Sequence, residues 1–92
     1  MKEKTIEAAV IAWVKMQGGI AMKVEAKGVR GWPDLDITLP GGRVALVEMK
    51  RPGGTVSPHQ AGWCYLLMQL GRLAFVAESL EEVQRRIHEH YD

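Results

Sequence analysis

The segment Val44–Lys50 constrains the fold of this chain more than any other part of its sequence. Four consecutive apolar residues, Val44–Val47, lead into Glu48, Met49 and Lys50. An unbroken apolar run, in place of strict alternation, is typical of a strand that is covered on both faces. Because both faces need a covering layer, the segment predicts a central strand in an α/β domain whose helices and sheet share one core.

A strand hairpin is predicted around this segment. Asp34–Leu39 alternates polar and apolar residues, as a strand does, and Pro40–Gly42 provides a tight turn into the apolar run. So short a link between two strands implies antiparallel pairing. Two further strands are predicted, over Ile20–Ala26 from its alternation and over Leu73–Ala77 from its apolar character.

Helices are predicted between and around these strands. Thr5 is placed to cap a first helix that runs to about Gln17. Ser57–Gln60 has the serine, proline and glutamine of a helix start with a capping box, and this helix should run to about Leu70. Ser79–Glu82 is a second capping box, which opens the last helix. The predicted order is therefore α-β-β-β-α-β-α, with a small mixed sheet.

The composition is that of a single globular domain over residues 1–92. No apolar run approaches the roughly 20 residues that a membrane helix needs, and the charged amino terminus does not open a signal peptide. The lone Cys64 excludes a disulfide framework and a thiolate zinc site. We therefore expect a cytoplasmic protein without membrane contacts. Its net charge of +1 does not by itself indicate a nucleic-acid partner.

Glu48 and Lys50 are the first candidate site residues. Period two places their side chains on one face of the strand, roughly 7 Å apart. Ions at such a position lose hydration at a cost of several kcal/mol each, unless partners or a metal compensate. Across the hairpin, antiparallel pairing can bring Asp34 level with Glu48. Two carboxylates held close repel each other, and a divalent cation between them removes that repulsion.

Glu7 is the third candidate carboxylate. It is the only charged residue between Thr5 and Val14, and helical spacing places it on the same face as Ile11. An inward acid needs a partner, which a metal site would provide. Because all these ligands are oxygen atoms, the expected metal is Mg²⁺, with Mn²⁺ as its substitute.

Together these residues predict the hydrolysis of phosphodiester bonds. The metal would bind a phosphate oxygen and activate a water molecule, and Lys50 would orient that water or neutralise charge in the transition state. Lys27, Arg30 and Arg51 lie in the loops beside the acids, where they are expected to bind phosphates of DNA without reading its bases. No small-molecule cofactor is expected.

For several other polar or aromatic residues we prefer a structural interpretation. Asp36 is interpreted as a solvated or hydrogen-bonded strand residue, Trp32 as locally packed beside a proline, and His59 as exposed at a helix start. His88 and His90 are two apart on a helix and diverge, so a zinc pair is not expected.

The order of these motifs resembles a known family. Pro33-Asp34 followed by Glu48-Met49-Lys50 resembles the signature of the PD-(D/E)XK nuclease superfamily. The fuller pattern resembles a VRR-Nuc domain over about Thr5 to Phe75. It consists of a helical Glu7, Arg30–Leu35, Val47–Lys50, and Ser57–Gln60 before an apolar helix.

The resemblance implies a restriction-endonuclease-like αβββαβ core, here followed by a C-terminal helix, together with a divalent metal and DNA as substrate. It makes Glu7, Asp34 and Glu48 metal ligands, Lys50 catalytic and Gln60 an accessory site residue, although the capping box also explains that glutamine. The main-chain carbonyl of Met49 is implied to complete the metal shell.

Stand-alone bacterial and phage members of this family resemble homodimeric Holliday-junction resolvases. The sequence also favours a dimer, because the helix after Ser57 is apolar on more sides than one small core can bury. The leading hypothesis is therefore a homodimeric endonuclease for four-way DNA junctions. The alternatives are a nuclease of the same fold for flaps, nicked or duplex DNA, a non-catalytic DNA-binding module, and a structural domain whose charges form only ion pairs.

Overall fold

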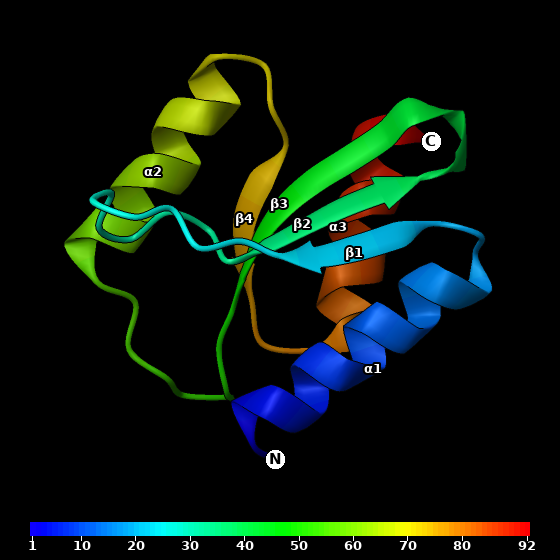
Figure 1. Ribbon diagram of the computed structural model, residues 1–92, viewed down its shortest axis with the longest axis horizontal. Coiled ribbons are helices and arrows are strands. Elements are labelled where there is room, and N and C mark those ends of the chain that lie inside the picture. The colour runs from blue at the N-terminus through cyan, green and yellow to red at the C-terminus, as the bar shows by residue number, and fades with distance from the viewer.

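The computed structural model describes residues 1–92 and contains the helices and strands in the predicted order (Figure 1). Along the chain they are α1 (Glu3–Met16), β1 (Ile20–Lys23), β2 (Leu35–Leu39), β3 (Arg43–Met49), α2 (Pro58–Gln69), β4 (Ala74–Ala77) and α3 (Leu80–Tyr91). The predicted α/β class and the order α-β-β-β-α-β-α are confirmed.

The four strands form one mixed sheet in the order β1-β2-β3-β4. β1 pairs with β2 and β2 with β3 in antiparallel fashion, whereas β4 lies parallel to β3. A short 3-10 turn, Pro40–Gly42, joins the hairpin, and Gly41 and Gly42 take φ of 82° and 74°, which glycine adopts without strain. β3 is thus paired on both edges and its last five residues are buried, as expected for a central strand.

The helices cover the two faces of the sheet unequally. α1 and α3 pack on one face and form the main core with inward residues of the strands, among them Leu35 and Ile37 of β2. α2 lies on the other face, apart from α1 and α3, with β3 and β4 between them (Figure 1). It buries a smaller cluster, formed by Leu46, Cys64, Leu67 and Ala74.

Because α2 packs on β4 and β3, apolar side chains stay on the surface elsewhere. Ile20 and Met22 of β1 are 62% and 61% exposed, and they share a face of the sheet with Asp36 and Thr38. None of the three helices combines the length and the apolarity that crossing a bilayer needs.

The predicted start of the first helix is wrong. α1 begins at Glu3, and Thr5 lies inside its first turn, because the amides of Thr5 and Ile6 both donate to the Lys2 carbonyl. Lys2 provides no side-chain cap, whereas Glu3 puts a negative charge at the positive end of the helix dipole. β1 also ends earlier than predicted, at Lys23.

The last helix is capped differently from the prediction. The Ser79 hydroxyl accepts a hydrogen bond from the Glu82 amide at 3.0 Å, as expected. The Glu82 carboxylate, however, accepts from the Glu78 amide and not from the amide of Ser79. Only half of the predicted capping box is therefore present, and Glu82 fixes the residue before the cap instead.

Candidate active site

The candidate site lies where β2 begins and β3 ends. Leu35 pairs with Val47 in the antiparallel register, so the next pair along the two strands is Asp34 with Glu48. Both residues lie on the face that α2 covers, at the edge of its smaller core. The sequence prediction that the hairpin brings Asp34 level with Glu48 is confirmed.

Glu48 is a buried carboxylate with few partners. Glu48 is only 6% exposed. The side-chain amide of Gln60 donates to Glu48 Oε2 at 3.3 Å, and Lys50 Nζ lies 3.8 Å from the same oxygen. Burial first, and then the negative charge of Asp34, raise the pKa of Glu48 from 4.5 to about 7, against the opposing charge of Lys50. The site therefore holds a carboxylate that lacks sufficient positive charge around it.

Glu7 reaches the site through a lysine. Lys23 Nζ donates to Glu7 Oε2 at 2.8 Å and to Asp34 Oδ2 at 2.9 Å, so one ammonium bridges α1 and the start of β2. Burial opposes the charged form of Lys23, but the hydrogen bonds to both carboxylates raise its pKa above the usual range. Glu7 is largely buried, with 16% of its side chain exposed, as its position on the apolar helix face predicted.

The sequence analysis missed Lys23. The sequence offered one indication of its role, since Lys23 lies on the strand before the hairpin, near the loop that leads to Asp34. Neither the helix pattern nor the strand alternation shows that Lys23 and Glu7 meet, because that contact depends on how α1 packs against the sheet.

Gln60 forms the predicted capping box and also contacts the candidate carboxylate Glu48, while its role in a site stays a prediction. The side-chain Oε1 of Gln60 accepts from the main-chain amide of Ser57 at 2.9 Å, and the Ser57 hydroxyl accepts from the main-chain amide of Gln60. The side-chain amide of Gln60 also donates to Glu48. The capping box therefore orients the same side chain that contacts the candidate carboxylate.

The loop before β2 is anchored on α2. The Trp63 indole donates to the Arg30 carbonyl at 2.9 Å, and Trp32 packs edge-on against Trp63 with ring centroids 5.2 Å apart. Gly31 lies so close to His59 that a Cβ would come within 2.7 Å of its main chain. These contacts fix the loop that leads to Asp34, and they confirm that Trp32 is locally packed.

The three predicted phosphate-binding residues, Lys27, Arg30 and Arg51, are all exposed in the loops that flank the site. None of them forms an ion pair within the chain. Their side chains are thus free to contact an anionic partner, and their role in DNA binding stays a prediction.

Other polar residues lie away from the site or have partners of their own. Asp36 pairs with Arg72 at 3.4 Å, as its interpretation as a hydrogen-bonded strand residue predicted, and His59 is exposed. The histidines of α3 form no metal site, and no group of three or more His, Cys, Asp or Glu side chains is arranged to enclose a metal ion. The side chain of Met49 is fully buried in the main core.

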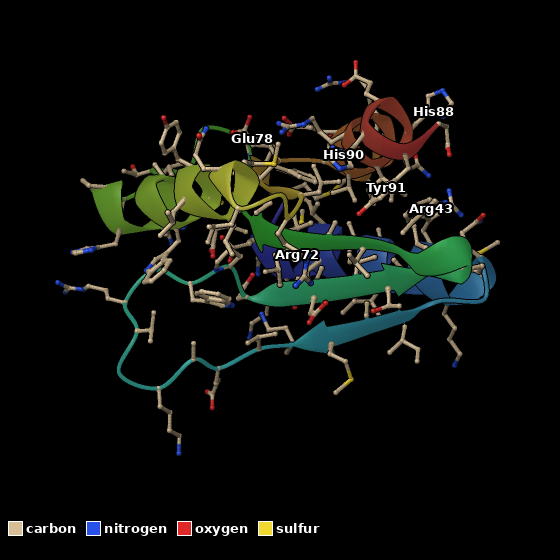
Figure 2. The ribbon with its side chains drawn as sticks, turned by 90° about the horizontal axis from the view of Figure 1, so that it is seen from above. Arg43, Arg72, Glu78, His88, His90 and Tyr91 are labelled. Atoms are coloured by element: carbon tan, nitrogen blue, oxygen red, sulfur yellow. The ribbon has the colours of Figure 1, made fainter.

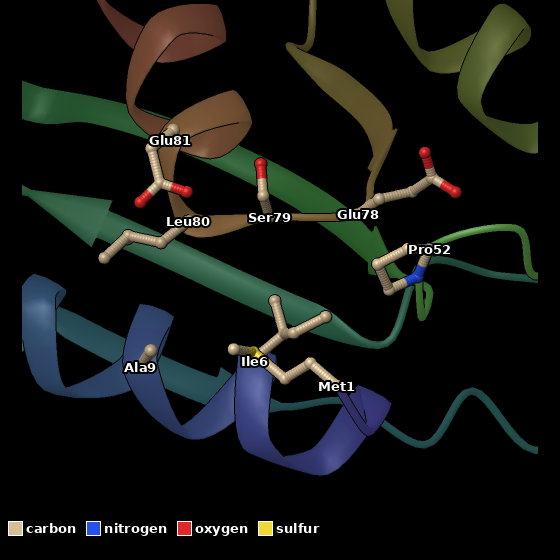
Figure 3. Close-up of a pocket in the computed structure, with 8 residues that line it drawn as sticks. All are labelled: Met1, Ile6, Ala9, Pro52, Glu78, Ser79, Leu80 and Glu81. Carbon is tan, nitrogen blue, oxygen red and sulfur yellow. The ribbon is translucent and has the colours of Figure 1, made fainter.

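A pocket of about 290 Å³ lies elsewhere, between the start of α1 and the connection from β4 to α3 (Figure 3). Its lining includes Ile6, Pro52 and Leu80 together with Glu78 and Glu81. None of the candidate site residues lines it. The acidic site is therefore separate from this pocket.

Two features indicate that the acidic strand end fits a divalent cation. Asp34 Oδ1 is buried without any hydrogen-bond partner, although buried polar atoms nearly always have one. The available donors are carboxylate oxygens alone, which suit Mg²⁺ or Mn²⁺ better than softer metals. A cation between Asp34 and Glu48 would satisfy the first oxygen and relieve the repulsion that, together with the larger effect of burial, raises the Glu48 pKa.

The fold and the site together define the class of the protein. An αβββαβ core presents Asp34, Glu48 and Lys50 at the end of its central hairpin, which is the arrangement that the resemblance to nuclease domains implied. Comparison with known proteins identifies the family more closely. A model of the VRR-NUC domain matches residues 3–81, and the chain belongs to this family.

Individual relatives agree with this assignment. "Putative nuclease p44" of Acyrthosiphon pisum secondary endosymbiont phage 1 is 37% identical over 79 residues, which cover 86% of this chain and 85% of that protein. A solved structure described as a VRR_NUC domain superposes with a TM-score of 0.85 at 29% identity, covering 100% of this chain and 99% of the other. A second, a VRR_NUC domain protein, has a TM-score of 0.75 at 21% identity over 96% and 86% of the two chains, and supports the fold alone.

Proposed function

We propose that this protein is a Mg²⁺-dependent endonuclease that hydrolyses phosphodiester bonds in DNA. One observation carries the proposal. Asp34 and Glu48 face each other at the end of the hairpin, Lys50 lies beside Glu48, and one oxygen of Asp34 is buried without a partner. Buried polar atoms nearly always have a hydrogen-bond partner, so the unpartnered Oδ1 of Asp34 supports a cation site at this strand end.

The residues of the chain then have distinct roles. Asp34 and Glu48 would hold the cation, together with the main-chain carbonyl of Met49. Glu7 would join them through a rearrangement of its side chain, since Lys23 lies between Glu7 and Asp34 and no three carboxylates surround one point in the metal-free chain. When bound, Mg²⁺ supplies a Lewis acid and a water of lowered pKa. Lys50 extends its ammonium toward the reacting phosphate, where it orients the attacking water and neutralises developing negative charge.

Gln60 and the basic loops complete the proposed machinery. Gln60 donates to Glu48 Oε2 and so limits the orientations of that carboxylate before a cation arrives. Lys27, Arg30 and Arg51 are exposed beside the site and would hold the phosphates that flank the scissile bond. The hydrogen bond from Trp63 fixes the main chain of Arg30 in the loop before Asp34.

We further propose that the active form is a homodimer acting on branched DNA, most specifically on four-way junctions. The end of α2 supports this part of the proposal, because Tyr65 and Leu70 are 69% and 74% exposed and Leu66 is 45% exposed. A two-fold interface on this apolar surface would give two identical sites, which symmetric cleavage of a junction requires.

The decisive experiment is cleavage of labelled four-way junctions with and without Mg²⁺, with Lys50→Ala as the matched variant. We expect paired, symmetric nicks from the wild type in Mg²⁺, none in EDTA, and junction binding without cleavage by the variant. Cleavage of flaps, nicked or duplex DNA in the same panel, without junction cleavage, would replace the junction part of the proposal. Binding without cleavage of any substrate would replace the enzyme by a DNA-binding module.

Sedimentation of the purified protein at micromolar concentration tests the dimer separately. A Leu70→Glu variant places a charge on the exposed end of α2 without touching the acidic site. We expect the wild type to sediment as a dimer and this variant as a monomer. A wild-type monomer would contradict the dimeric form.

A further inference from the structure

We infer that Lys23 holds the place of the divalent cation in the metal-free protein and withdraws from the site when the cation binds. This inference rests on the proposed metal site and adds a residue to it. It makes Lys23 a positioning residue, whose ammonium keeps two carboxylates together until a metal replaces it.

The geometry around Lys23 is that of an occupied cation site. Its Nζ contacts one oxygen of Glu7 at 2.8 Å and one of Asp34 at 2.9 Å. Neither carboxylate has another cationic partner within the chain. One positive charge therefore holds together a helix and a strand end that both contribute a proposed metal ligand.

The two lysines of the site differ in their freedom to move. The Lys23 side chain is 52% exposed, whereas 17% of Lys50 is exposed. A half-exposed lysine on a flexible four-carbon stem can turn from its partners into water once a cation supplies the positive charge that they lose. Lys50 is more confined and lies close to Glu48, so it stays in place.

The balance of formal charge also favours withdrawal of Lys23. Three carboxylates (Glu7, Asp34 and Glu48) and two lysines give the ionised site one net negative charge. A divalent cation added to this set would leave one excess positive charge beside buried oxygens. If Lys23 moves out as the cation enters, the site is neutral. A cation and the ammonium also compete for the same two carboxylates, because Glu7 and Asp34 are both proposed ligands and Lys23 Nζ already contacts one oxygen of each.

Isothermal titration with Mn²⁺ in the absence of DNA tests the competition. Lys23→Met removes the competing ammonium, so we expect Mn²⁺ to bind about tenfold more tightly than to the wild type. The same variant should melt about 5 °C lower in EDTA, because Glu7 and Asp34 are left without a countercharge. The matched control is Lys4→Met, which removes an exposed positive charge one turn from Glu7 on α1 and should leave both values unchanged.

Two further measurements distinguish competition from a general effect of charge. Lys23→Arg keeps the positive charge, so we expect the wild-type melting temperature in EDTA and no tightening of Mn²⁺ binding. In the wild type, the ¹⁵Nζ and ¹³Cε resonances of Lys23 should shift to solvent-exposed values as Mg²⁺ saturates the site, while those of Lys50 keep a bound environment. This measurement needs no variant and so does not depend on the folding of Lys23→Met.

The outcomes separate this inference from the proposed function. If the wild type and Lys23→Met both fail to bind Mn²⁺, the proposed metal site itself is wrong. If the wild type binds Mn²⁺ but Lys23→Met binds it with equal or lower affinity, the metal site stands and the inference about Lys23 is overturned. Unchanged Lys23 resonances at saturating Mg²⁺ would overturn it as well.

Discussion

The two ends of β3 differ in how completely their polar groups are satisfied. At the Arg43 end, the Tyr91 hydroxyl accepts from the Val44 amide at 3.0 Å and donates to the carbonyl of the same residue. Arg43 also lies 3.7 Å from Asp92, and Figure 2 shows Tyr91 of α3 beside it. The end of α3 thus takes the place of the neighbouring strand where β4 does not extend.

At the Glu48 end the same strand leaves its polar groups short of partners. Glu48 has one amide donor and a lysine at 3.8 Å, and an oxygen of Asp34 has no partner at all. The Arg43 end shows that this fold can provide hydrogen-bond partners for the polar groups of a strand end. The deficit at the other end is what the proposed metal site would require, with some stability given up locally.

Among variants that distinguish the two ends of β3, Lys50→Ala is expected to have the largest effect on catalysis. The variant removes the confined ammonium from the Glu48 end and leaves the Tyr91 end untouched. Because a single group that stabilises transition-state charge is typically worth 10²–10³-fold, we expect kcat for DNA cleavage to fall about 1000-fold. DNA affinity in a gel-shift assay should change little. A variant that cleaves at the wild-type rate would remove Lys50 from the chemistry.

Glu48→Gln should increase the free energy of unfolding in the absence of metal, because it removes a carboxylate that lacks sufficient countercharge. A carboxyl group whose pKa is raised in the folded protein favours folding below its ordinary pKa of 4.5, and this contribution is lost as the pH rises through about 7. Above pH 7 in EDTA, ionised Glu48 therefore costs up to about 3 kcal/mol, which the neutral glutamine avoids.

Urea unfolding of wild type and Glu48→Gln in EDTA, at pH 4 and pH 8, measures this difference. We expect the variant to be the more stable protein at pH 8 and the two to converge at pH 4. Added Mg²⁺ should reverse the order at pH 8, since only the wild type offers the charged ligand. Equal stability at both pH values would mean that Glu48 is adequately neutralised without a metal.

Tyr91→Phe tests the satisfied end of β3. The substitution leaves the Val44 amide and carbonyl without their partner on the open edge of β3. Because an unmade hydrogen bond at a partly buried group costs about 1–3 kcal/mol, we expect the free energy of unfolding to fall by about 2 kcal/mol. kcat should stay at the wild-type value when the assay is run well below the melting temperature. A drop in kcat with intact folding would show that the two ends are coupled.

The hairpin end of the site was predictable from the sequence because its determinants are local. The turn Pro40–Gly42 fixes the register of β2 against β3, and period two then decides which side chains of each strand share a face. Asp34 and Glu48 could therefore be brought together without knowledge of the rest of the fold. The inward position of Glu7 followed in the same way from helical spacing.

Apart from the details of two helix starts, the contacts that the sequence did not predict join residues far apart in the chain. Lys23 meets Glu7 because α1 packs across the end of the sheet, and Trp63 holds the Arg30 carbonyl although the two residues are 33 positions apart. Tyr91 meets Val44 across 47 positions. No periodicity or capping signal records such pairs, since they depend on packing between elements and not on the pattern within one.

The smallest effects are expected at the helix start that meets the Glu48 end, where Gln60 serves both the fold and the site. Ser57→Ala removes only the capping hydroxyl, so it should lower stability by about 1 kcal/mol and leave catalysis nearly unchanged. Gln60→Ala removes the return bond of the capping box and the amide that contacts Glu48. A similar loss of stability should therefore be accompanied by weaker metal binding.

The pair of variants separates the two roles of Gln60. We expect the Mg²⁺ concentration for half-maximal cleavage to rise a few-fold in Gln60→Ala and to stay at the wild-type value in Ser57→Ala, because only the former frees the Glu48 carboxylate to rotate. If both variants shift the Mg²⁺ requirement equally, the helix start as a whole controls the site and not the Gln60 amide. If neither does, Gln60 is a capping residue alone, and the Glu48 end of β3 depends only on Lys50 and Lys23 for its countercharges.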